Sequence, residues 1–172
     1  HLNENHGLYG VRDNEIRSLE TISEYTNPDG NLSFATLAQT IDGIPVFAGE
    51  VKAAFTKRGE IVRVINNLLP ESGISSLSSD FGTARDAVIN SAAHIRYNPT
   101  KELAHNTVEI GGKYPKVTFG AGDFATTAEK FYFPIEAGVA IPAWRVLFWV
   151  DDYNAFYVIV DANDGTLLWR KN

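Results

Sequence analysis

The stretch Ile41-Asp42-Gly43-Ile44-Pro45-Val46-Phe47-Ala48-Gly49-Glu50-Val51 holds residues that shape turns and strands, and no acid, base or nucleophile in an obvious catalytic arrangement. Asp42-Gly43 can form a turn with positive φ. Pro45 lacks a backbone donor, so we expect its strand to lie at a sheet edge or to begin there. Gly49 predicts a bulge or a close backbone approach. The stretch indicates a module that contacts another protein.

Strand-like runs flank this stretch on both sides. They cover residues 18–25, 32–41, 46–56 and 61–69, and turn residues separate them: Asn27-Pro28-Asp29-Gly30, Asp42-Gly43 and Lys57-Arg58-Gly59-Glu60. Turn signals about every 10 residues between β-prone runs predict an antiparallel meander.

The second half of the chain follows a Ser-rich candidate boundary at residues 70–79. A helix is expected over residues 83–95, capped by Asp80, because small and apolar residues recur there at helical spacing. Residues 106–127 look loop-rich. Strands are expected at 131–135, 143–150, 156–160 and 166–170.

Aromatic side chains are dense in this half. Alternation over residues 143–150 places one set on one side of the strand (Trp144, Val146, Phe148, Val150) and the other set opposite (Arg145, Leu147, Trp149). Leu147 and Trp149 are large for a solvent-facing surface, so we expect the helix or a partner to cover the second side. The aromatics could line a ligand pocket, but at strand spacing they more often form a core or a protein-contact face.

Composition excludes several classes of function. The 172 residues, 44% hydrophobic and 21% charged, suit one sizeable domain or two small subdomains of a globular protein. The formal net charge of −6 removes the electrostatic basis for binding nucleic acid or an anionic membrane. No apolar run approaches the roughly 20 residues of a membrane span. The chain lacks cysteine, which excludes disulfides and Cys-ligated metals. It also lacks methionine even at position 1, so we expect it to start after a cleavage or to be a piece cut from a longer sequence.

Catalytic and metal-binding patterns are weak. The four histidines form no His-Glu-x-x-His or His-x-x-x-His motif. Residues 161–165, Asp-Ala-Asn-Asp-Gly, superficially resemble a calcium loop but lack its closing glutamate, and a hairpin turn explains them without an ion. Asp151-Asp152 is most simply a solvated loop. We therefore expect no enzyme activity, no catalytic residue, no cofactor and no metal.

A family resemblance gives the opening stretch a meaning. Residues 39–51, together with 59–64 and Asn67-Leu68-Leu69-Pro70, resemble the fungalysin/thermolysin propeptide motif. Residues 83–95, 131–134, 143–146 and 157–165 are similar to the PepSY region that follows this motif in such precursors. Residues 97–129 look like an insertion.

The resemblance implies a pro-region of a secreted zinc metallopeptidase, a non-catalytic chaperone and inhibitor whose partner is the cognate peptidase domain. It implies an α+β fold with antiparallel sheets packed on helices, cystatin-like and PepSY-like in two halves, at residues 1–73 and 74–172. Six residues are expected to face the partner: Pro45, Phe47, Trp169, Arg170, Lys171 and Asn172. The alternative is a stand-alone extracytoplasmic module that binds a peptide or cell-wall ligand. In both cases we expect a secreted or periplasmic location.

Overall fold

The structure, a computed structural model, describes residues 2, 4–70, 77–105, 108–111, 115–151 and 153–172. Its helical segments are η1 (His6–Tyr9), α1 (Asp13–Arg17), α2 (Ala84–His94) and α3 (Thr100–Leu103). The chain forms two compact units, residues 1–76 with 134–140, and residues 77–133 with 141–172. We call them unit 1 and unit 2, and each is described by itself.

The expectation of an α+β fold is wrong, because strands dominate the chain. Strands account for 50% and helices for 13%, and the strands follow the hydrogen-bonded order β1-β2-β3-β7-β8-β9-β10, with β4 beside β3 and β5–β6 beside β7. The physical reason is the periodicity of the apolar residues, which alternate with period two over most of the chain. Among the described helices, α2 alone is long enough to bury a face.

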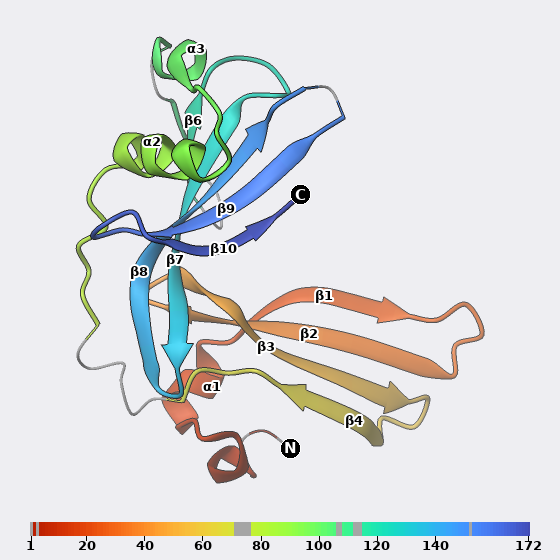
Figure 1. The fold of residues 1–172 in the computed structure, drawn as a ribbon. Coiled ribbons are helices and arrows are strands. Elements are labelled where there is room, and N and C mark those ends of the chain that lie inside the picture. Colours follow the sequence, from red (N-terminus) through yellow and green to blue (C-terminus); the bar gives the residue numbers. More distant parts are fainter. Residues whose placement is uncertain (1, 3, 71–76, 106–107, 112–114, 152) are drawn as a thin grey trace. The chain divides into compact units, whose positions relative to one another are not determined.

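Unit 1 is built on an antiparallel meander, as the turn spacing predicted. Its strands are β1 (Glu20–Thr26), β2 (Leu32–Ile41), β3 (Ile44–Thr56) and β4 (Ile61–Asn66), and each pairs with its neighbour in sequence. They lie side by side in Figure 1. The run expected to extend to residue 69 leaves the sheet after Asn66.

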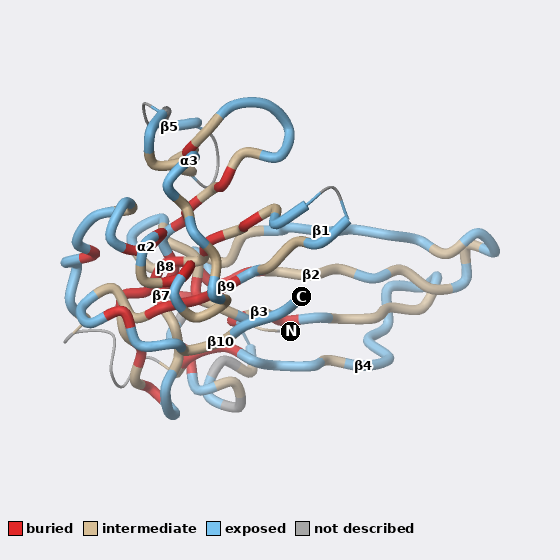
Figure 2. Tube along the Cα trace, turned by 45° about the horizontal axis from the view of Figure 1, so that its top comes forward, coloured by how far each residue is buried: buried red, intermediate tan, exposed pale blue. Residues whose placement is uncertain are grey.

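The core of unit 1 lies at one end of this sheet. Val11, Val51 and Leu68 are buried together, and partly buried apolar residues of the N-terminal segment pack on them, including Tyr9 and Ile16. Toward the other end of the strands the residues are intermediate or exposed (Figure 2). The sheet therefore has a packed base and an open distal part.

Unit 2 contains α2, α3 and the greater part of the other six strands: β5 (Val108–Ile110), β6 (Lys116–Phe119), β7 (Thr126–Glu136), β8 (Val139–Trp149), β9 (Ala155–Asp161) and β10 (Leu167–Lys171). The first two residues of β8 group with unit 1. β7 runs into residues 134–136, which group with unit 1. The segment expected to be loop-rich thus holds β5 and β6, which pair antiparallel.

Aromatic residues contact both sides of β8. On the first side, Tyr97, which follows α2 in sequence, contacts Phe148 with ring centroids 5.5 Å apart, and the Trp144 indole donates to the Phe81 carbonyl at 2.6 Å. On the second side, Trp149 contacts Phe124 edge-on at 5.2 Å. Leu147 and Trp149 are partly buried, and the expectation that the helix or a partner covers this side stays a prediction.

The N-terminus of α2 is capped by Thr83, three residues after the expected cap. The Thr83 hydroxyl accepts from the Asp86 amide at 3.1 Å. Asp80 instead accepts from the Gly82 amide in the preceding turn. Both residues are suitable caps, so residue type alone did not separate them.

Candidate partner-binding surfaces

The signature stretch begins with the turn that the sequence predicted. Asp42 and Gly43 have φ of 52° and 78°, and Ile41 pairs directly with Ile44. Two central residues with positive φ define a two-residue hairpin turn whose twist matches that of the strands.

Pro45 is the second residue of β3 and pairs with Thr40. β3 has neighbours on both sides, so it is not an edge strand. Of the two expectations for Pro45, the one that holds is a strand that begins there. Pro45 and Phe47 are both partly buried.

A large bulge follows Pro45. The pairs Ala38–Glu50 and Thr40–Pro45 leave residues 46–49 opposite Gln39 alone, and Ala48 has φ of 55°. A Cβ on Gly49 would lie 2.9 Å from Val46 Cβ and 3.2 Å from Gln39 Oε1. The expected close approach at Gly49 is therefore present, and it explains why this position has no side chain.

The amide of Gln39 fills the space that the bulge opens. Gln39 is 2% exposed; its Nε2 donates to the Leu69 carbonyl at 3.0 Å, and its Oε1 accepts from the Leu69 amide at 2.8 Å. We call this pairing the Gln39–Leu69 clasp. It gives the backbone of Leu69 hydrogen bonds beyond Asn66, where the β3–β4 pairing ends. Sequence reasoning missed this role. The available signal was a glutamine near the end of a mostly apolar strand, just before the stretch that holds Gly49.

The signature residues are therefore structural. The turn, the bulge and the clasp join β2, β3 and the segment after β4 at the base of unit 1, and their polar groups bond to one another.

The expected C-terminal contact residues lie in unit 2. Trp169 is partly buried on β10 and pairs with Ile159, and Arg170 Nη1 donates to the His94 carbonyl at 3.1 Å. Lys171 and Asn172 are exposed. The structure thus places Trp169, Arg170 and Lys171 on β10, with Asn172 directly after it, while Pro45 and Phe47 lie in unit 1.

The polar residues considered for chemistry have structural partners. His94 Nε2 lies 2.9 Å from the Gly165 carbonyl, and Asp161 Oδ1 accepts from the Asn163 amide at 2.8 Å. Asn154 and the Tyr153 amide hold the pKa of Asp151 below its usual range, because their hydrogen bonds favour the charged form. Asp152 and His1 lie outside the described residues. Within the described residues, no group of three or more His, Cys, Asp or Glu side chains could hold a metal ion.

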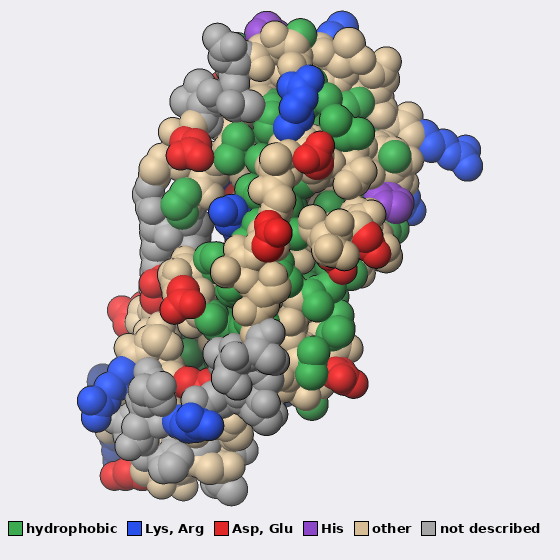
Figure 3. All heavy atoms as spheres, turned by 90° about the vertical axis from the view of Figure 1, so that its left-hand side faces the viewer, with side chains coloured by type: hydrophobic (Ala, Val, Ile, Leu, Met, Phe, Trp, Pro, Cys, Tyr) green, Lys and Arg blue, Asp and Glu red, His purple; other side chains and the backbone are tan. Residues whose placement is uncertain are grey.

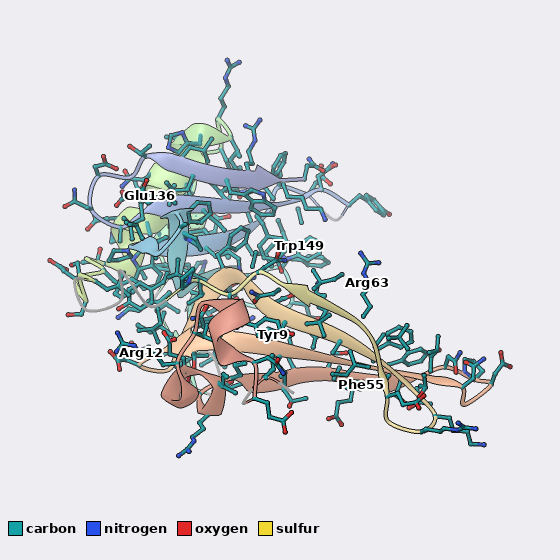
Figure 4. All side chains as sticks on the ribbon, turned by 90° about the horizontal axis from the view of Figure 1, so that it is seen from below. Tyr9, Arg12, Phe55, Arg63, Glu136 and Trp149 are labelled. Carbon is teal, nitrogen blue, oxygen red and sulfur yellow. The ribbon has the colours of Figure 1, made fainter. Side chains whose placement is uncertain are left out.

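The open part of unit 1 offers candidate surfaces. We call residues 22–26, 32–36, 52–56 and 61–65 the distal half of the sheet; nearly all of them are intermediate or exposed. One face has a hollow of about 340 Å³ with apolar lining that includes Leu37, Ala53, Phe55 and Val64. The other has a hollow of about 270 Å³ that includes Phe34, Lys52, Ala54 and Arg63. Phe55 and Arg63 project from opposite sides of the sheet (Figure 4).

Comparison with protein families supports the class of module that this unit defines. The family model of the Fungalysin/Thermolysin Propeptide Motif matches residues 18–68, the span that contains β1 to β4. The motif is that of propeptides of fungalysin/thermolysin-type metallopeptidases, so it indicates a non-catalytic propeptide role and association with a cognate peptidase domain. No curated protein matches the chain. None of the described helices is long and apolar enough to cross a membrane.

Proposed function

We propose that this chain is a pro-region that assists the folding of a secreted zinc metallopeptidase and inhibits it until cleavage. The observation that carries the proposal is the propeptide-motif match over residues 18–68. We further propose that unit 2 corresponds to a PepSY-like region, on the pattern of its helix and closing strands, and that the protein acts outside the cell.

Binding to a native-like peptidase surface accounts for both roles. A pro-region that binds the folded peptidase also binds the folding transition state that resembles it. This binding lowers the free energy of both states relative to the unfolded peptidase. If the pro-region contacts the peptidase at or near its active-site cleft, the same contact keeps substrate out. We propose two surfaces for this contact. One is the distal half of the sheet in unit 1, together with Pro45 and Phe47. The other is the end of β10, with Trp169, Arg170 and Lys171, and the following Asn172.

The test combines the purified chain with a mature thermolysin-type peptidase from the same source. We expect a higher refolding yield of the denatured peptidase and inhibition of the native enzyme at micromolar chain. An unrelated acidic protein of similar size is the control for nonspecific effects.

Two results would contradict the proposal: no binding at micromolar concentration, and no effect on refolding yield. Binding of peptide or cell-wall fragments in place of the peptidase would instead support a stand-alone binding module.

A further inference from the structure

We propose that one face of the distal half docks an acidic surface of the peptidase. We call it the basic face; it consists of Tyr25, Phe34, Lys52, Ala54, Arg63 and Ile65. Arg63 would donate to a carboxylate of the partner, and the Tyr25–Phe34 pair would pack on apolar side chains beside it. The inference deepens the proposed function and rests on it.

Strand register gathers these residues. Phe34 pairs with Ala54, and Ala54 pairs with Arg63, so the three lie side by side across three strands. Lys52 and Ile65 form the next row on the same face. Because Ala54 has the smallest side chain in the centre, a hollow of about 270 Å³ lies between Phe34 and Arg63.

The aromatic residues point to a protein as the occupant. Tyr25 and Phe34 are 55% and 41% exposed, and their rings stack with centroids 6.2 Å apart. Adjacent exposed aromatics beside an arginine have the composition of interface hot spots, where Tyr, Trp and Arg are enriched. Both faces of the distal half are open, so the exposed Tyr25–Phe34 pair is the patch that we expect a partner protein to cover.

The charge of the face points to an acidic partner. Lys52 is paired with Glu50 at 2.9 Å, but Arg63 has no hydrogen bond or ion pair with any residue that the structure describes. Lys52 and Glu50 offset each other, so Arg63 leaves the strand residues of this face with a net positive charge. Lys57, Arg58 and Glu60 lie at the β3–β4 turn, outside the face.

This local sign is opposite to that of the whole chain, whose net charge is −6. On the face shown in Figure 3, acidic and basic side chains are instead interspersed. A bidentate Arg–carboxylate contact is the interaction that an unpaired guanidinium beside an apolar hollow can form. A second copy of the chain would have to meet this face with a different surface, and such a head-to-tail contact gives a ring or an open filament of copies.

The experiment compares two charge reversals in the full chain. Arg63→Glu places a carboxylate on the basic face, and Arg58→Glu makes the same change in net charge at the β3–β4 turn, outside that face. The readout is the dissociation constant with the mature peptidase, with thermal unfolding to confirm the fold and sedimentation to report oligomers. We expect Arg63→Glu to weaken binding about tenfold or more, and Arg58→Glu to change it less than about threefold.

Phe34→Ala is a second, charge-neutral variant, and we expect it to weaken binding about fivefold or more. If the chain binds the peptidase and both Arg63→Glu and Phe34→Ala leave the affinity unchanged, the docking face is wrong while the proposed function stands. If the unmodified chain does not bind, the proposed function fails, and the inference fails with it. A dimer of the chain that Arg63→Glu dissociates would overturn the choice of partner.

Discussion

At the scale of single residues, the Gln39–Leu69 clasp is the contact on which unit 1 most depends. Replacing Gln39 with Leu keeps a similar volume but leaves the buried amide and carbonyl of Leu69 unpaired. Each unpaired buried group costs about 1–3 kcal/mol, so we expect Gln39→Leu to lower the free energy of unfolding by about 2–6 kcal/mol. Chemical denaturation measures this loss, and Thr26→Val, which removes an exposed hydroxyl contact with Ser33, is the control. An effect of Gln39→Leu no larger than that of the control would show that the clasp adds no stability.

A second residue-scale prediction concerns Gly165, which has φ of +74° in the β9–β10 turn. A Cβ at this position would clash with the Asn90 side chain, with Asn90 Cγ at 2.5 Å. We expect Gly165→Ala to destabilise unit 2 by about 1–3 kcal/mol from backbone strain, plus a further loss from the clash. In denaturant titrations, Asn90→Ala in the same chain should restore part of the loss. Full additivity of the two substitutions would contradict the clash.

At the scale of elements, two substitutions before helix α2 test which residue caps its N-terminus. Because Thr83 bonds the Asp86 amide, Thr83→Ala should cost about 1 kcal/mol, within the range of about 0.5–2 kcal/mol known for N-caps. Asp80→Ala should cost less, since Asp80 bonds only the turn amide of Gly82. Equilibrium unfolding of the two variants compares these values. The reverse order would restore Asp80 as the cap.

Tyr97, in the connection between α2 and α3, should make the free energy of unfolding fall as the pH rises above 10. Burial, and then the hydrogen bond from its hydroxyl to Glu102, raise the pKa of Tyr97 to about 12. A pKa raised in the folded state contributes stability that is fully present below the unfolded value of 10.0 and is lost between pH 10 and 12. Unfolding free energies measured across this range should fall less steeply in Tyr97→Phe. Equal slopes for the two proteins would contradict the raised pKa.

The strands of unit 1 were predictable because their signals are local. Turn residues such as Asp42-Gly43 and alternation along each strand fix where β1 to β4 lie, within a few residues. The clasp was not predictable, because it joins residues 30 positions apart through a side chain that only the bulge brings into place. What covers each side of β8 was not predictable for a related reason: alternation separates the two sides of a strand but does not say which one a helix covers.

At the scale of the whole molecule, the signature stretch and the proposed contact face have different tasks. The stretch that resembles a known family holds the base of the sheet together, while the residues of the basic face, such as Phe34 and Arg63, lie in the open part. This explains why the sequence suggested the class of protein more readily than its contact surface. The overall α+β expectation came from the resemblance and was wrong, because alternation outweighs helical spacing over most of the chain.

The salt dependence of association tests whether the local field or the net charge guides binding. A chain of net charge −6 that approaches an acidic surface would be repelled overall, and added salt would then speed association. If the basic face meets that surface, attraction acts at short range, and raising ionic strength from about 0.05 to 0.5 M should slow association several-fold. Stopped-flow or surface-binding kinetics measure the rate constant, and Arg63→Glu should flatten its dependence on salt while Arg58→Glu should not. Faster association at high salt for the unmodified chain would mean that the net charge, and not the basic face, governs the encounter.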